Sequence, residues 1–134
     1  MTKSESVIRS ILGAVRVDIR PLAFAVDTAV DLMFVQGIPM DDIFVTDDIY
    51  PKAAEHFRKR SGEASTPKAV ARRIERLSNL CWDTIVSRGL VMDYIGAQIK
   101  DIRAPRDIIF YLAFYVYFDK PFFTVIAKQP ALLF

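Results

Sequence analysis

The stretch from Ser65 to Gly89 constrains the fold of this chain more than any other part, because it combines a marked helix start with a regular amphipathic pattern. Ser65 or Thr66 can cap the free amides at a helix start, and Pro67 suits the first helical position, where a missing N–H costs nothing. At about 100° per residue, one stripe of this helix is apolar and comprises Val70, Ile74, Leu77, Cys81 and Ile85. The stretch therefore predicts a long helix with one face in a hydrophobic core.

The opposite face of the predicted helix is polar and mainly cationic. It comprises Lys68, Arg72, Arg76 and Asn79. One interpretation is a solvated surface helix, since Lys and Arg are good helix formers that favour water. The other is a DNA recognition helix, in which these side chains read base edges.

Positive charge is concentrated around this helix. Residues 58–76 carry seven basic and two acidic side chains, a net charge of +5, whereas the whole chain has a net charge of +2. The rest of the chain therefore has a net charge of −3. This asymmetry favours a surface that meets phosphates, although a basic loop that only keeps the protein in solution is the alternative. The residues expected to contact DNA phosphates are Arg58, Lys59, Arg60, Thr66 and Arg73.

Several elements occur here in a recognisable order. Residues 50–57 read YPKAAEHF and fit the frame YPxxAxxF. The helix that follows carries Val70, Arg72, Ile74 and Trp82 and is followed by Ser87-Arg88-Gly89. This combination resembles the DNA-binding C-terminal effector domain of the stage-zero sporulation protein A family. The similarity can be followed with gaps from about Val7 to Phe118, and it includes residues 17–30.

The resemblance implies an all-α fold, a compact bundle of about five to six helices that contains a helix-turn-helix. Ile49 to Arg58 would be the supporting helix, and Pro67 to about Ser87 the recognition helix. Their connection of roughly eight residues is longer than the usual three or four. The segment 58–64 looks like an insertion relative to the family. The chain is expected to act without the receiver domain that precedes this domain in the full-length family protein.

The resemblance also assigns roles on the recognition helix. The family's base-reading Glu-Arg pair falls on Ala71 and Arg72, so only the arginine is kept, and it can donate two hydrogen bonds to a guanine. A family arginine falls on Glu75 and a family histidine on Arg76, which changes the charge pattern. The side chains expected to read bases are Arg72, Arg76, Lys68 and Asn79, at an operator different from the family's.

Helices are also expected on both sides of this motif. Ser4 or Ser6 can cap a first helix that ends near 13–16, and a second, longer helix is predicted from Leu22 to Gln36 with Gly37 as its stop. The aspartate pairs 41–42 and 47–48 would cap helices. They lack the glycine-centred loop and closing Glu of a calcium site, so no metal site is predicted.

No catalytic group of residues stands out. His56 is the only histidine, and Cys81 is the only cysteine and lies on the apolar stripe. A single His and a single Cys exclude the usual zinc ligand sets, and no glycine-rich phosphate loop occurs. The sequence therefore predicts a protein that is not an enzyme and uses no cofactor, with His56 at the surface or in packing and Cys81 as a buried thiol.

The C-terminal part is strongly apolar. Ile108 to Phe118 are eleven apolar residues, fewer than the roughly 18–20 that cross a bilayer, so a buried helix is expected, with a strand as the alternative. Asp119 to Phe134 carry seven large apolar side chains, which must be covered. Pro121 and Pro130 argue against one continuous helix, so an extended strap is predicted, laid over its own domain or over a second copy.

The sequence as a whole is therefore interpreted as one domain, residues 1–134, with 119–134 as an apolar extension. The N-terminus does not read as a signal peptide, and a cytoplasmic location without membrane contact is expected. The predicted function is sequence-specific binding of double-stranded DNA by a transcriptional regulator, with a homodimer through the C-terminal region left open. The alternative is a protein-interaction module on the same scaffold, which has lost base reading and binds a partner or itself.

Overall fold

The computed structural model describes residues 1–57, 66–99 and 106–134, and this described part is helical throughout, without a strand. Its seven α-helices are α1 (Lys3–Leu12), α2 (Arg20–Val30), α3 (Tyr50–His56), α4 (Pro67–Ser87), α5 (Val91–Tyr94), α6 (Arg106–Phe118) and α7 (Phe122–Lys128). Short π and 3-10 turns add η1 (Asp31–Val35), η2 (Met40–Asp42), η3 (Val45–Ile49) and η4 (Pro130–Leu132). The predicted all-α class is confirmed. The number of helices exceeds the expected five to six, and α7 is one that the sequence did not predict.

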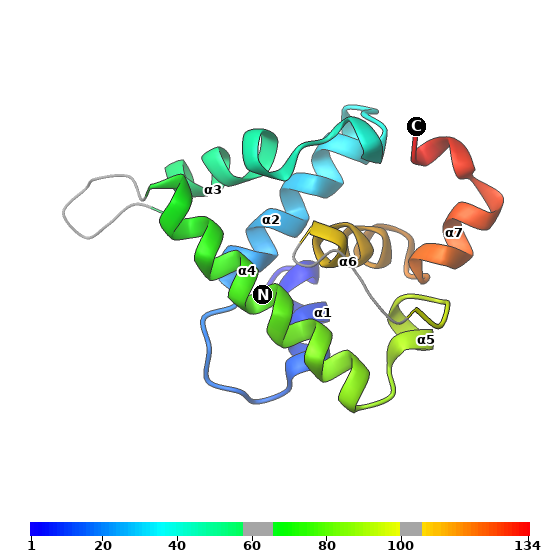
Figure 1. Ribbon diagram of the computed structural model, residues 1–134, viewed down its shortest axis with the longest axis horizontal. Helices are drawn as coiled ribbons and strands as arrows, with labels where there is room; N and C mark the ends of the chain where they lie inside the picture. The colour runs from blue at the N-terminus through cyan, green and yellow to red at the C-terminus, as the bar shows by residue number, and fades with distance from the viewer. Residues whose placement is uncertain (58–65, 100–105) are drawn as a thin grey trace.

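Helix α6 lies at the centre of the fold, with the other helices around it (Figure 1). It packs against α1, α2, α4, α5 and α7. Its buried side chains are Ile108, Ile109, Phe110, Leu112, Ala113, Phe114 and Val116. A helix that is apolar on nearly all sides is stable only when other elements cover it. The apolar composition of residues 108–118 was compatible with a helix or a strand, and the structure shows that these residues form a buried core helix.

No single described helix is long and apolar enough to cross a bilayer. Helices α6 and α7 together reach that length and composition, but a bend of 70° separates them.

The first two helices differ from the prediction at their ends. The hydroxyl of Thr2, rather than Ser4 or Ser6, caps α1 by accepting a hydrogen bond from the Glu5 amide at 3.1 Å. Ser4 is buried and donates to the Asp27 carboxylate on α2, a tertiary contact that the local pattern does not contain. The predicted second helix is present as α2 and then widens into η1, and Gly37 with φ of 75° ends it.

The aspartate pairs 41–42 and 47–48 lie in the first turns of η2 and η3, but no side-chain hydrogen bond caps η2, η3 or α3, so the predicted caps are not formed. The Asp48 carboxylate accepts a hydrogen bond from the Phe44 amide at 2.8 Å, which closes the turn η3. Helix α3 then ends at His56, whose exposed ring stacks on Phe24 with 4.3 Å between ring centroids. His56 is thus a surface residue that also packs, as the sequence indicated.

The prediction of an extended C-terminal strap is wrong. Residues 122–128 form α7, which places Phe122 and Val125 in the core at 5% and 4% exposure. Pro121 stands at the N-cap of this helix, and Pro130 begins η4, so both prolines mark helix starts rather than breaks in an extended chain. Except for the exposed Phe134, the large apolar side chains of the tail pack against the core of their own chain. The Asp41 amide donates to the Leu133 carbonyl at 2.8 Å, and the Phe123 amide donates to the Ile95 carbonyl at 3.0 Å.

Cys81 is completely buried on α4, and burial raises the pKa of its thiol to about 12. We expect native Cys81 to resist alkylation by iodoacetamide at about pH 8, because only the thiolate reacts and the side chain is covered. One thiol per chain should become reactive in denaturant. Rapid alkylation of the native protein, measured by mass spectrometry, would contradict this burial.

The raised pKa of Cys81 is expected to make the folded protein less stable in alkali. An unfolded thiol ionises near its ordinary pKa of 9.0, whereas the folded one keeps its proton up to about 12. The folded state therefore binds more protons in this range, so the contribution of Cys81 to stability is complete below about pH 9 and is lost as the pH rises towards 12.

Candidate nucleic-acid interface

Helix α4 begins where the sequence predicted. The Thr66 hydroxyl accepts a hydrogen bond from the Ala69 amide at 3.1 Å, and Pro67 is the first helical residue. The predicted apolar stripe is buried, and Ser78 joins it; the buried set is Val70, Ile74, Leu77, Ser78, Cys81 and Ile85. This stripe holds α4 against α1, α2, α3 and α6, and the opposite side of the helix lies at the surface (Figure 1).

All four predicted base-reading side chains lie on that outer side. Lys68, Arg72, Arg76 and Asn79 are exposed. We call these four residues the outer row of α4. Among the described residues, none of the four forms an ion pair or a side-chain hydrogen bond. At a rise of about 1.5 Å per residue, the row extends over roughly 16 Å of the helix. Its donors are therefore available to a ligand.

Arg73 has a different position from the outer row. Its guanidinium forms an ion pair with Asp18 at 3.5 Å and lies over the Phe57 ring, 5.7 Å from the centroid. The Asp18 carboxylate also pairs with Arg20 at 2.8 Å, and the side-chain hydrogen bond from Arg20 is the main cause that lowers the pKa of Asp18. The phosphate contact predicted for Arg73 would therefore have to compete with a carboxylate of its own chain.

The connection between α1 and α2, which carries Asp18, is fixed from the α1 side as well. The guanidinium of Arg9 donates to the carbonyl oxygens of Val15 and Val17 at 2.6 and 2.8 Å. This connection runs beside α4 in Figure 1. Two arginines from different helices, Arg9 and Arg73, therefore hold it in place.

The other predicted phosphate contacts lie at the start of α4 and before it. Thr66 is exposed and uses its hydroxyl oxygen as the helix cap, which leaves its O–H free to donate. The N-terminal end of a helix also carries partial positive charge that attracts phosphate. Arg58, Lys59 and Arg60 lie outside the described residues.

Helices α3 and α4 occur in the order that a helix-turn-helix requires. They pack against each other, and both contact α2. The connection of residues 58–65 lies outside the described ranges, so the turn itself stays a prediction.

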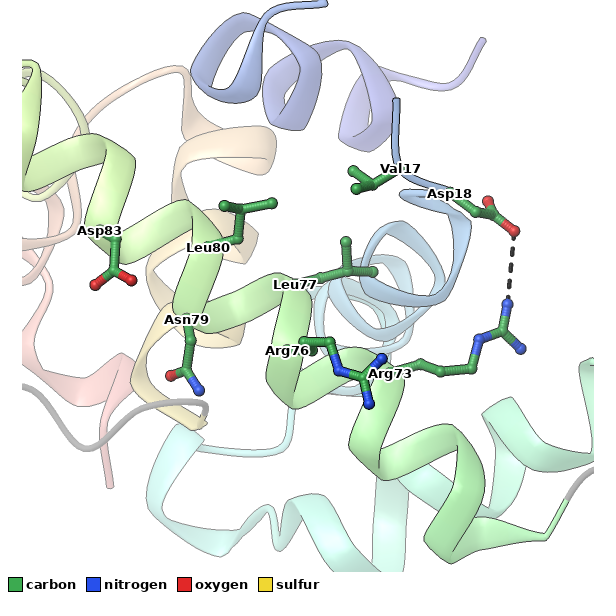
Figure 2. A pocket seen from close by; sticks show the side chains of 8 residues that line it. All are labelled: Val17, Asp18, Arg73, Arg76, Leu77, Asn79, Leu80 and Asp83. Carbon is green, nitrogen blue, oxygen red and sulfur yellow. Dashed lines mark ion pairs between the residues drawn. The ribbon is translucent and has the colours of Figure 1, made fainter. Parts of the chain in front are cut away.

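A pocket that the sequence did not predict lies beside the outer row. It has a volume of about 480 Å³ and lies between α4 and the connection before α2. Figure 2 shows the side chains that line it, which are Val17, Asp18, Arg73, Arg76, Leu77, Asn79, Leu80 and Asp83. The exposed Asp83 lies four residues after Asn79, so helical spacing alone could have placed it beside the outer row.

Trp82 packs against the core but is only partly buried. Its side chain lies at the border between the buried stripe of α4 and the surface. Its substitution by alanine should therefore cost less than that of a fully buried aromatic residue.

Comparisons of the chain with protein-family models, curated proteins and solved structures found no match. Within the described ranges, no group of three or more His, Cys, Asp or Glu side chains is placed to hold a metal ion. The geometry and charge of α4, together with the sequence resemblance, are therefore the indications of function.

Proposed function

We propose that this chain binds double-stranded DNA in a sequence-specific way, as a transcriptional regulator of helix-turn-helix type, with α4 as its recognition helix. The observation that carries the proposal is the outer row of α4. It places three cations and one amide, all exposed and without partners in the described part of the chain, on one side of a helix whose other side is buried.

The chemistry of the outer row suits base reading. An α-helix fits the major groove, where Arg72 and Arg76 can each donate two hydrogen bonds to a guanine, and Asn79 can pair with an adenine. Recognition helices contact bases mainly through their N-terminal residues. The position of Asp83 in the C-terminal half agrees with this, because a carboxylate there would repel phosphates.

The packing of α4 supports the proposal because it holds the helix in a fixed position. Its core stripe includes Val70 and Ile74 at 0% exposure, and these residues lie within one turn of Arg72. Side chains that project from a fixed helix lose less freedom on binding than those of a mobile loop.

The proposal is tested by binding of the full chain to random genomic DNA fragments over a series of salt concentrations, followed by sequencing of the retained DNA. Each neutralised phosphate should lower the logarithm of the binding constant by about 0.9 for each unit of log salt concentration. A steep salt dependence with an enriched motif supports the proposal. A shallow dependence without a motif contradicts it.

A substitution tests the central contact. Arg72→Ala should reduce the preference for one guanine in the selected motif by about 1–3 kcal/mol, because the bidentate contact is lost. Lys128→Ala removes the same charge from an exposed position of α7 and serves as the control, which should keep the motif unchanged. If Arg72→Ala kept both the affinity and the motif of the original chain, α4 would not be the reading helix.

The alternative function is a protein-interaction module, and one observation favours it. Large apolar side chains of elements other than α4 are exposed, among them Val35 at 74%, Phe44 at 64% and Phe134 at 75%. Not all aromatic residues of the tail are accessible to a partner, because Phe122 is buried in its own chain. Sedimentation of the full chain over a range of concentrations tests the homodimer, and the DNA selection separates the two functions.

A further inference from the structure

We infer that the pocket beside α4 binds a small amphipathic monocarboxylate, and that this ligand competes with DNA. The pocket is the 480 Å³ space between α4 and the connection before α2. The binding of the ligand is independent of the proposed DNA-binding function, whereas the competition rests on it.

The inner wall of the pocket is apolar. Figure 2 shows Val17, Leu77 and Leu80 pointing toward one another from the connection and from α4. Leu77 is almost fully buried, and the other two are partly buried against the core. Volumes of roughly 300–1,000 Å³ with apolar walls and few polar groups are typical of small-molecule sites. The wall therefore suits a short alkyl or aryl group.

The polar rim selects an anion with one charge. Arg76 has no ion-pair partner among the described residues, and the Asn79 amide beside it adds a donor. Arg73 is already paired with Asp18, so Arg76 is the cation that remains for a ligand. A guanidinium can hold a carboxylate through two charge-assisted hydrogen bonds.

The two carboxylates of the pocket limit the charge of the ligand. Asp18 is compensated by Arg20 and Arg73, at 2.8 and 3.5 Å. Asp83, on the other side of Asn79, has no ion-pair partner in the described part of the chain. Its charge disfavours a second anionic group, so a monocarboxylate fits better than a phosphate or a dicarboxylate.

The ligand and DNA would use the same donors. Arg76 and Asn79 line the pocket and also belong to the outer row of α4. A carboxylate bound to Arg76 removes one cation and covers an amide on the surface proposed to face the major groove. Binding of the two partners is therefore mutually exclusive, and each weakens the apparent affinity of the other.

The first experiment measures binding of 4-phenylbutyrate to the full chain by calorimetry, with neutral 4-phenylbutyramide as the matched probe. We expect saturable binding of the acid and about tenfold weaker binding of the amide, because a hydrogen bond to a charged group is lost. Arg76→Gln should weaken binding of the acid by a similar factor. Lys68→Gln removes the same charge from the same side of the helix but not from the pocket, and it should leave acid binding unchanged.

Two results would overturn the pocket assignment: no saturable binding of the acid at millimolar concentration, or equal affinities for the acid and the amide. Circular dichroism confirms that both variants are folded, as expected for exposed positions. In the second experiment, saturating 4-phenylbutyrate should weaken DNA binding of the original chain. Unchanged DNA affinity overturns the competition. Acid binding by a chain that does not bind DNA contradicts the proposed function and the competition but supports the pocket.

Discussion

Replacement of Phe114 by alanine is expected to lower the free energy of unfolding by about 3–5 kcal/mol, the usual cost of removing a buried aromatic ring. Phe114 on α6 is completely buried. Its ring contacts Phe34 at 5.3 Å, Phe122 at 4.8 Å and Phe118 at 5.9 Å between centroids. The substitution therefore opens a cavity where η1, α6 and α7 meet. Denaturation in urea measures the loss.

Tyr117, one turn later on α6, provides the matched control. Its ring stacks on Phe34 at 4.4 Å between centroids, but half of the residue is exposed. Tyr117→Ala should cost about 0.5–1.5 kcal/mol, because an exposed stacked pair loses little buried area. Equal losses at the two positions would mean that the contact between α6 and the tail is not part of the core.

Replacement of Gly96 by alanine should cost about 2–4 kcal/mol, from two physical causes. Gly96 has φ of +89°, where a side chain adds roughly 1–2 kcal/mol of strain. Its new Cβ would also lie 2.8 Å from the Cβ of Pro121, and such overpacking costs about 1–3 kcal/mol. Pro121 stands at the start of α7, so the clash would push the tail away from the segment after α5.

The variant Gly89→Ala distinguishes the backbone strain from the steric contact with Pro121. Gly89 has φ of +67°, but a Cβ added there meets no atom within 4 Å. Gly89→Ala should therefore cost only the strain, about 1–2 kcal/mol. The difference between the two variants in urea denaturation gives the cost of the contact with Pro121. If both variants lost the same stability, the close approach of the tail to Gly96 would be refuted.

Local signals predicted the elements that depend on local chemistry. Thr66, Pro67 and Gly89 bound α4 through capping, a fixed φ and a positive φ, and all three effects act within one turn of chain. The same reasoning misplaced the cap of α1, because Ser4 is used by Asp27 on another helix. It also misread the tail, since a proline that interrupts one helix can begin the next.

For the candidate site, too, the sequence predicted the part that depends on local pattern and not the part that depends on tertiary contacts. Helical periodicity identified the exposed outer row of α4, because exposure on an amphipathic helix follows from its period. It did not identify the pairing of Arg73 with Asp18, which lies 55 residues earlier in the sequence. The pocket depends on that connection as well, so only the tertiary structure could show it.

The pairing of Arg73 with Asp18 makes Asp18 an internal competitor at high effective concentration, since both groups are carried by the same chain. A DNA phosphate could recruit Arg73 only after the outer row had already brought it close. Arg73 would then contribute to how long a complex lasts rather than to how quickly partners meet. Asp18 would remain paired with Arg20 throughout, so the transfer of Arg73 to a phosphate would not leave the Asp18 carboxylate without an ion-pair partner.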